Sequence, residues 1–234
     1  MFVTLRVNAE APVKATQQKK GRHMGHSQAD KAQSRERILS EAATQIRDTG
    51  LESVSVGKLM HSVGLTHGGF YNHFESRSDL LVHALDRALE AGQHASLAAT
   101  GAGMSARGFE ARVRAFFSRS HRDGRATGCA FAALAADVAR ADAPVRAVMS
   151  RHLDEFIAQT VTSLNAPDDG DAMLAVSAMV GALVLARVQL DPKRSDAMLR
   201  GVRERVLALN RVDAPGDRPS HPAASAAPAR KNTP

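Results

Sequence analysis

The residues best suited to chemistry lie in the run from Thr66 to Phe74, Thr-His-Gly-Gly-Phe-Tyr-Asn-His-Phe. It combines a hydroxyl, two imidazoles, a phenol and a carboxamide, which donate or accept hydrogen bonds. Thr66, at the start of a short predicted helix, is placed to hold a phosphate with its hydroxyl and free backbone N–H groups. Tyr71, the chain's one tyrosine, suits a phosphate or a thymine methyl group. These residue types favour recognition over bond breaking.

No competing set of catalytic or metal-binding residues stands out elsewhere in the sequence. There is no nucleophile motif, phosphate-binding glycine loop or paired-carboxylate pattern. The ten histidines show no ligand spacing, and His61, His67 and His73 all fall in the segment around the run. We therefore predict that the protein is not an enzyme, binds no metal and needs no cofactor.

Two short helices hinged at Gly64 are predicted to position the run. Ser55 suits the N-cap of the first helix, and Gly64 suits a left-handed C-terminal cap. Thr66 then caps the second, very short helix. The apolar residues of the first helix recur at i, i+3, i+4 and i+7, namely Val56, Leu59, Met60 and Val63. This order is typical of a helix-turn-helix, whose second helix enters a DNA major groove.

Composition predicts an all-α protein. Hydrophobic residues make up 44% of the 234, and Ala and Leu dominate the middle of the chain, where Pro is scarce. A single Cys excludes an intrachain disulfide and fits a reducing cytoplasm. We see no secretory signal and no apolar run long enough to cross a membrane, so we expect a cytoplasmic protein without a membrane partner.

The net charge of +7 lies mostly near the two ends of the chain. Residues 1–33 carry six basic and two acidic side chains, and residues 211–234 carry four and two. Within residues 34–92 the acidic side chains outnumber the basic ones, eight to six. The prediction of DNA binding therefore depends on the motif, with the basic tails as non-specific helpers.

The sequence divides into four predicted parts. Residues 1–33 read as a disordered basic tail, within which Met24 is an alternative start to Met1, and residues 211–234 read as a second disordered tail. Residues 34–92 form the helix-turn-helix domain around the motif 55–74. Residues 93–210 form a second helical domain.

The segment 173–190 is apolar almost all round, which predicts burial on every side. We interpret it as a subunit interface as well as core, and a purely intrachain central helix is the alternative. Pro192 opens a final amphipathic helix. The candidate interface residues are Met179, Leu183, Ala186, Leu199, Val202 and Val206.

The sequence resembles the tetracycline-repressor (TetR/AcrR) family of bacterial transcriptional regulators. The resemblance is carried by Ser34-Arg-Glu-Arg-Ile-Leu, Gly50-Leu-Glu, the run Gly64–Phe74, and Ser76-Arg-Ser-Asp-Leu-Leu. It implies an all-α homodimer with a three-helix DNA-binding head, a ligand-binding body over residues 93–210, and a four-helix dimer interface. Members of this family usually carry a basic residue at the position that His67 occupies in this sequence.

The residues expected to contact double-stranded DNA surround the second helix. Glycines 68 and 69 leave room for close approach of the backbone to DNA, as the resemblance implies, and Lys58 and Arg77 suit backbone phosphates. The second helix has no Arg or Lys, so strong guanine readout from it is not expected. The full set is Ser55, Lys58, Thr66, His67, Gly68, Gly69, Tyr71, Asn72, His73 and Arg77.

An effector pocket in the body is expected to be apolar. Its candidate residues equally suit a plain core. They are Phe116, Phe117, Cys129, Phe131, Leu134, Met149, Leu153 and Phe156. Cys129 follows two arginines at a predicted helix N-terminus, which would lower a thiol pKa and favour sensing of electrophiles or oxidants. A small buried apolar residue is the alternative, and the one that we favour.

The leading hypothesis is a ligand-responsive repressor that binds a palindromic operator as a homodimer and is released by an unidentified small molecule. An activator is an alternative in the same class. A helical enzyme or ligand-binding protein with an incidental helix-turn-helix is the alternative from another class.

Overall fold

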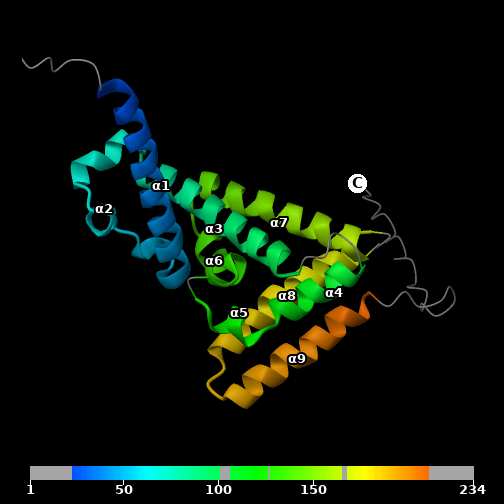
Figure 1. Cartoon of the computed structure of the whole chain (residues 1–234). Helices are drawn as coiled ribbons and strands as arrows, with labels where there is room; N and C mark the ends of the chain where they lie inside the picture. The colour runs from blue at the N-terminus through cyan, green and yellow to red at the C-terminus, as the bar shows by residue number, and fades with distance from the viewer. Residues whose placement is uncertain (1–22, 101–105, 126, 165–167, 211–234) are drawn as a thin grey trace, which may run out of the picture.

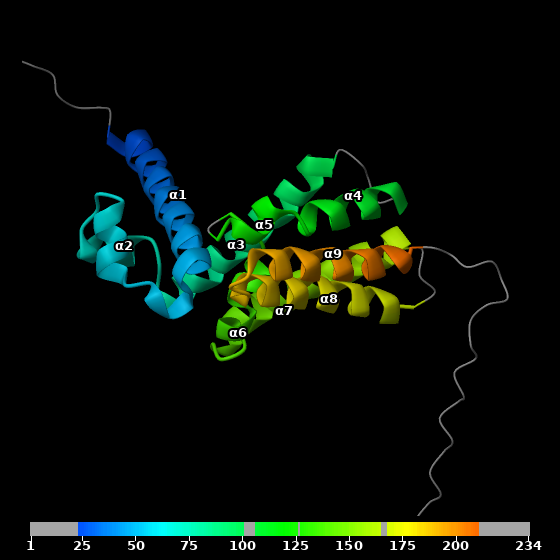
Figure 2. The same ribbon diagram turned by 90° about the horizontal axis from the view of Figure 1, so that it is seen from below.

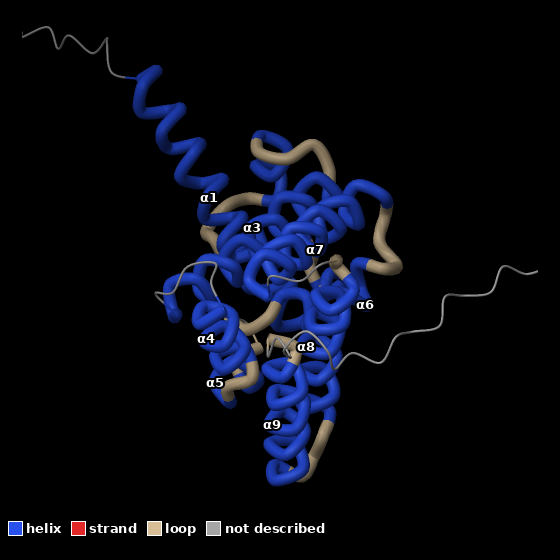
Figure 3. Tube along the Cα trace, turned by 90° about the vertical axis from the view of Figure 1, so that its right-hand side faces the viewer, coloured by secondary structure: helices blue, strands red, loops and turns tan. Residues whose placement is uncertain are grey.

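The computed structural model describes residues 23–100, 106–125, 127–164 and 168–210, and the regular structure in these ranges is helical throughout. This confirms the all-α prediction. The proposed tails at residues 1–22 and 211–234 lie outside the described residues. Helix α1 spans His23–Thr49, so the prediction that order begins near Ser34 is wrong. The first turns of α1 project away from the rest of the molecule (Figure 3).

The N-terminal end of the molecule, which we call the head, holds α1 and the three short elements that follow it. These are η1 (Leu51–Ser53), α2 (Val56–Ser62) and η2 (His67–Asn72). The head lies at one side of Figure 1, with α2 packed beside α1. Gly50 ends α1 with a φ of 89°, a backbone conformation that glycine adopts at little cost.

The remaining helices form the second domain, which we call the body. They are α4 (Ala106–Phe116), α5 (Arg119–Asp123), α6 (Ala130–Val138), α7 (Ala143–Leu164), α8 (Gly170–Val188) and α9 (Pro192–Ala208). Helices α4 and α5 are separated at Ser118, whose hydroxyl caps α5 by accepting a hydrogen bond from the His121 N–H at 3.2 Å. Helices α8 and α9 lie side by side along one flank of the body (Figure 2).

Helix α3 (Arg77–Thr100) connects head and body, since it packs against α1 on one side and against α7 on the other (Figure 1). It continues beyond Gly92, where the sequence predicted its end. The buried apolar residues form one continuous core from Ile38 in α1 to Val206 in α9. The head is therefore packed onto the body through shared apolar contacts.

Helix α8 has one buried and one exposed apolar face. Among the described residues it alone is long and apolar enough to cross a membrane, so the expectation that no such run exists is wrong. It packs against α7 and α9, as the core helix of a folded domain does. Its exposed large apolar residues are Met173, Leu174, Val184, Leu185 and Val188, followed by Leu190.

The residues predicted to form a dimer interface are mostly not on that exposed face. Five of them are at most 5% exposed because they pack α8 and α9 into the chain's own core. These five are Met179, Leu183, Ala186, Leu199 and Val206. Val202 is partly buried against the same core. These six residues therefore pack within the chain itself, whereas the exposed apolar residues of this region lie on the opposite face of α8.

Candidate nucleic-acid interface and junction pocket

A tight turn at Gly64 sets the angle between α2 and η2. Gly64 has a φ of 72° and donates its N–H to the His61 carbonyl at 3.0 Å. The Leu65 N–H reaches the Met60 carbonyl at 2.8 Å, which completes a Schellman cap. The Arg37 guanidinium of α1 donates to the Val63 carbonyl. The helix-turn-helix prediction and its left-handed glycine agree with this geometry.

The short element η2 is held in place by its first residue and by one buried ring. Thr66 caps it, since its hydroxyl accepts a hydrogen bond from the Gly69 N–H at 3.3 Å. The Phe70 ring is 1% exposed and stacks on Phe74, with ring centroids 5.5 Å apart. Both rings belong to the same core as Ile38. The element η2 is therefore anchored in the core by Phe70.

The remaining residues of η2 point outward. Tyr71 is 67% exposed, and its ring packs edge-on against Phe70 with centroids 5.3 Å apart. A Cβ atom added to Gly68 would meet nothing within 4 Å, so no packing inside the chain requires a glycine there. His67, Asn72 and Lys58 are also exposed. Together with Thr66, these side chains offer hydrogen-bonding groups and one cation to a ligand outside the chain.

Two candidate DNA contacts are placed differently from the expectation. Arg77 donates from Nε to the Val54 carbonyl at 3.2 Å and from Nη2 to the Leu51 carbonyl at 2.8 Å. Its guanidinium thus holds the η1 turn and has fewer donors left for a phosphate. Burial, helped by Lys31 and Arg35, lowers the pKa of His73, whose Nδ1 is buried without a hydrogen-bond partner. Its protonated form is therefore disfavoured by burial and by two cations of α1, which makes His73 a poor cationic contact for DNA.

Neither Ser55 nor Gly69 has a demanding role in the local structure. Ser55 stands at the N-cap of α2, but its side chain makes no capping hydrogen bond, contrary to the prediction. A Cβ atom on Gly69 would lie 3.5 Å from Thr66 Oγ1 and 3.7 Å from Met60 Cε, so the site is close to its neighbours without being crowded.

The acidic surplus of the head is partly neutralised by ion pairs. Glu36 on α1 accepts from Arg87 Nη1 at 2.9 Å, and Glu52 lies 3.5 Å from Arg77. Asp86 on α3 pairs with Arg151 and with the buried His152 of α7. The element η2 itself carries no acidic residue. Glu36, Glu52 and Asp86 therefore have basic partners, which offsets part of the negative charge on this side of the molecule.

The apolar residues predicted to line an effector pocket instead fill the core. Phe117, Cys129, Phe131, Leu134 and Met149 are buried, and the Phe131 and Phe156 rings pack 5.9 Å apart. Phe116 is half-buried against Phe117, whereas Leu153 is exposed on α7. This favours the plain-core alternative.

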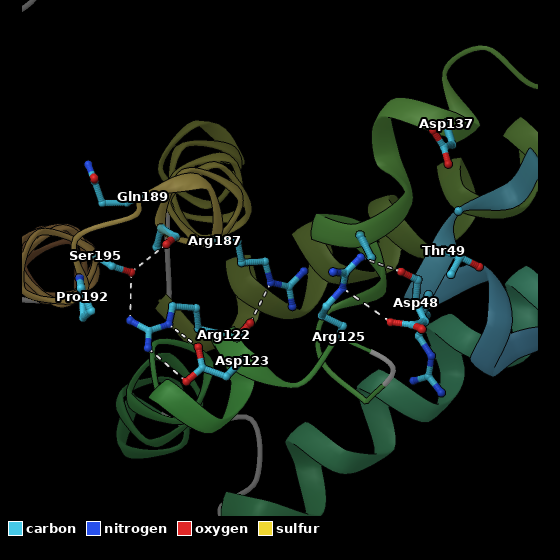
Figure 4. Close-up of a pocket in the computed structure, with 14 residues that line it drawn as sticks. Asp48, Thr49, Arg122, Asp123, Arg125, Asp137, Arg187, Gln189, Pro192 and Ser195 are labelled. Carbon is cyan, nitrogen blue, oxygen red and sulfur yellow. Dashed lines mark hydrogen bonds and ion pairs between the residues drawn. The ribbon is translucent and has the colours of Figure 1, made fainter. Parts of the chain in front are cut away.

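The described residues do surround a pocket of about 630 Å³, which lies between head and body (Figure 4). We call it the junction pocket. None of the apolar residues predicted to form an effector pocket lines it. Its lining comes from the end of α1, from α5 and the loop after it, and from α6, α8 and α9. The residues are Arg47, Asp48, Thr49, Gly50, Arg122, Asp123, Arg125, Ala133, Asp137, Ala186, Arg187, Gln189, Pro192 and Ser195.

Hydrogen bonds and ion pairs tie the walls of the junction pocket together (Figure 4). Arg122 Nη1 donates to Ser195 Oγ at 2.9 Å, joining α5 to α9. It also donates to Asp196 Oδ1 at 2.9 Å. Arg125 Nη2 donates to the Asp48 carbonyl at 2.9 Å, joining body to head. The sequence analysis missed this set because its members are dispersed over five helices. Its one signal was Arg187, the sole charge in the apolar run 173–190.

Cys129 is at a helix N-terminus, as predicted, but it is not activated. It caps α6, with the Ala132 N–H 3.5 Å from Sγ. Burial raises the pKa of the thiol, and this outweighs the opposing effects of the backbone N–H groups and of Arg187. The expectation of a lowered thiol pKa is wrong, because a thiolate here would be almost completely desolvated.

Comparisons with known proteins point to one family. The sequence model described as "Bacterial regulatory proteins, tetR family" matches residues 38–84, which include α2 and η2. An uncharacterized HTH-type transcriptional regulator of Mycobacterium tuberculosis, found in two strains, is 27% identical over 186 residues, or 74% of this chain and 94% of the relative.

Solved structures of tetR-family proteins share the fold. A TetR transcriptional regulator from Chloroflexus aurantiacus superposes with a TM-score of 0.65 at 22% identity, over 77% of this chain and 95% of that one. Reduced Escherichia coli NemR gives 0.64 at 18% identity, over 74% and 95%. The TetR-family regulator SCO4454 from Streptomyces coelicolor gives 0.56 at 27% identity, over 76% and 95%. Residues 38–84 therefore form the DNA-binding segment of the tetR family of bacterial regulatory proteins, and the chain is a DNA-binding transcriptional regulator.

Proposed function

We propose that this regulator is a repressor that binds a palindromic operator as a homodimer and is released by a small molecule. The observation that carries the DNA-binding part is the construction of η2. One aromatic ring, Phe70, anchors it in the core, while its neighbour Tyr71 stands 67% exposed. Tyrosine is enriched at binding surfaces, because its ring is apolar and its hydroxyl can form a hydrogen bond with a partner.

Each exposed group of η2 has a suitable counterpart on DNA. The Thr66 hydroxyl accepts the Gly69 N–H and keeps its own proton to donate to a phosphate. The Tyr71 phenol can donate to another phosphate or contact a thymine methyl group, and the Asn72 carboxamide can pair with an adenine edge. Lys58 adds a cation to the same region. Sequence preference then depends on Asn72, His67 and the spacing of two copies.

The exposed stripe of α8 supports the homodimer. Leu174, Leu185 and Val188 are each more than half exposed and recur at helical spacing on one face of the helix. Gly181 lies in the same stripe, where an added Cβ would meet nothing within 4 Å, so a second helix can approach closely. A second copy of α8 has the matching apolar face, since a two-fold interface pairs a surface with itself. Two heads held in this way would read two half-sites.

A gel shift on the DNA upstream of the protein's own coding sequence tests this function. We expect a saturable, sequence-dependent complex for the wild type and its loss for the double variant Thr66→Ala, Tyr71→Ala. The single variant Leu153→Ala on α7 is the control, because it removes an exposed apolar side chain far along the chain from η2. Retained binding by the double variant would contradict the assignment of η2 and favour the enzyme or ligand-binding alternative. Transcription from the same promoter in vitro separates a repressor from an activator.

A further inference from the structure

The junction pocket holds more positive charge than its own carboxylates neutralise. Four arginines and three aspartates line it. Arg122 is paired with Asp123 and Asp196, and Arg125 lies 3.5 Å from an Asp48 oxygen. Asp137 pairs with Arg140 outside the pocket. Within the described part of the chain, Arg47 and Arg187 have no carboxylate at ion-pair distance.

Two backbone carbonyls hold the Arg187 guanidinium in the wall of the junction pocket. Its Nε donates to the Arg122 carbonyl at 2.9 Å and its Nη2 approaches the His121 carbonyl at 3.3 Å. A Cβ atom on the buried Gly128 would lie 2.8 Å from Arg187 Nη2, so the loop after α5 folds closely around the guanidinium. Burial lowers the pKa of Arg187. The cation is thus partly desolvated, while its hydrogen-bond partners are neutral backbone carbonyls.

Arg47 supplies a second such cation from the head. It is half-buried at the end of α1, and its Nε donates to the Ala43 carbonyl of its own helix at 3.2 Å. Burial is also what lowers the pKa of Arg47. A partly buried cation is costly unless an anion accompanies it, and a planar guanidinium matches a carboxylate or phosphate through two parallel hydrogen bonds.

The pocket is also where head and body are joined. Asp48, on its head side, is held by Arg125 from the body, and the Leu51 N–H donates to Asp137 of α6 at 3.1 Å. An anion between Arg47 and Arg187 would add a third connection and would compete with Asp48 for Arg125. Its occupancy would therefore favour one placement of the head over another.

We propose that the junction pocket binds a small metabolite bearing an oxyanion, a carboxylate or a phosphate, between Arg47 of the head and Arg187 of the body, and that this ligand sets operator affinity. The second half of this proposal rests on the proposed function, whereas binding itself does not. A polar, anionic effector replaces the apolar effector expected from the core residues.

The test uses full-length protein in a buffer free of oxyanions. Inorganic phosphate and succinate are titrated separately, with succinamide as the uncharged analogue of succinate and with chloride at matched ionic strength. We expect one of the two anions to raise the Tm saturably, by about 5 °C near saturation, and chloride and succinamide to have no such effect. The same anion should change operator affinity at least tenfold in the gel shift. Whichever anion acts identifies the headgroup.

Substitutions of single arginines show where the anion binds. Arg47→Gln and Arg187→Gln should each abolish the saturable response, and Arg47→Lys should weaken it because the ammonium has no planar fork. Arg114→Gln on α4 is the matched control, since it removes an exposed arginine whose partner is Glu110 of the same helix. A wild-type response equal to that with chloride, or an unchanged response in Arg47→Gln, would overturn the proposal. Arg47 tests the site even if Arg187→Gln fails to fold.

The two proposals fail in distinguishable ways. If the protein binds no upstream DNA but an anion raises its Tm in an Arg47-dependent manner, the anion site stands and the repressor function is wrong. If it binds the operator and no oxyanion changes either the Tm or the affinity, the repressor function stands and the anion site is wrong.

Discussion

The Asp137 carboxylate of α6 accepts a hydrogen bond from the backbone N–H of Leu51, 3.1 Å away across the boundary between body and head. The same oxygen lies where a side chain on Gly50 would be, since an added Cβ would come within 2.6 Å of Asp137 Oδ2. Gly50 is therefore required twice, for its positive φ and for the space that Asp137 occupies.

Replacing Gly50 should show both requirements. We expect Gly50→Ala to lower the free energy of unfolding by about 1–3 kcal/mol, from left-handed strain together with the steric conflict. Asp137→Ala should cost about 1–2 kcal/mol because it leaves the Leu51 N–H without its acceptor. Urea denaturation of both single variants and the double variant measures the coupling. A double variant whose cost equals the sum of the two would contradict the direct contact.

Gly68 should behave in the opposite way. Nothing lies within 4 Å of its would-be Cβ and its φ is not in the left-handed region, so Gly68→Ala should leave stability unchanged or raise it by up to about 1 kcal/mol. Operator affinity should fall, because the added methyl group would stand between backbone and DNA. Denaturation and gel shift on the same preparation separate the two effects. Undiminished affinity would show that DNA does not approach this glycine.

Substitutions at Arg77 and Lys58 should show that the first cation stabilises the fold and that the second contacts DNA. Arg77→Met removes two hydrogen bonds to the carbonyls of Val54 and Leu51 and should cost about 1–3 kcal/mol of stability. Lys58→Met should leave stability within about 0.5 kcal/mol. It should also reduce the slope of log K against log salt by about one if Lys58 contacts a phosphate. The assignment is wrong if the salt slope drops with Arg77→Met alone.

His121 predicts a loss of stability in acid. Burial, with a contribution from Arg187, lowers the pKa of His121 from 6.5 to about 4. The unfolded chain therefore takes up this proton first as the pH falls, and stability declines between pH 6.5 and pH 4. From pH 7.5 to pH 5 the expected loss is about 2 kcal/mol. Chemical denaturation across this range should show less decline in His121→Phe, which keeps a ring against Phe116. An equal decline in both proteins would rule out His121 as its source.

The exposed face of α8 predicts the oligomeric state. Wild type should elute as a dimer with its mass determined by light scattering, and Leu174→Asp with Leu185→Asp should yield monomer or raise the dissociation constant by at least about a hundredfold. Leu153→Asp is the control, since it places the same charge on an exposed leucine of another helix. A wild-type monomer at micromolar concentration would contradict the proposed dimer.

Local patterns in the sequence predicted the head well, because short-range chemistry determines its geometry. Gly64 is the left-handed cap, Thr66 the N-cap, and Phe70 and Phe74 the anchors, and each follows from residue type and spacing. Arg77 shows the limit of such reasoning. Its carbonyl partners lie 23 and 26 residues earlier, and no pattern around Arg77 indicates them.

The body was predicted less well, because tertiary packing decides which face of each of its helices is buried and which is exposed. The segment 173–190 is apolar on both sides, so periodicity could not distinguish buried Met179 from exposed Leu185. Most of the residues predicted to line an effector pocket fill the core instead. Half of the residues that line the junction pocket are charged and come from distant segments, and only the fold brings Arg47 and Arg187 to one cavity.

Because α1 is long, a small tilt at the junction pocket would produce a larger displacement at the far end of the helix. Its 27 residues correspond to about 40 Å at 1.5 Å of rise per residue, with one end in the wall of the junction pocket and the other projecting beyond the head (Figure 3). As a lever pivoting at Gly50, it would convert a tilt of about 3° into about 2 Å of travel at the far end. In a pair of heads this travel would double to about 4 Å, slightly more than the spacing of about 3.4 Å between neighbouring base pairs.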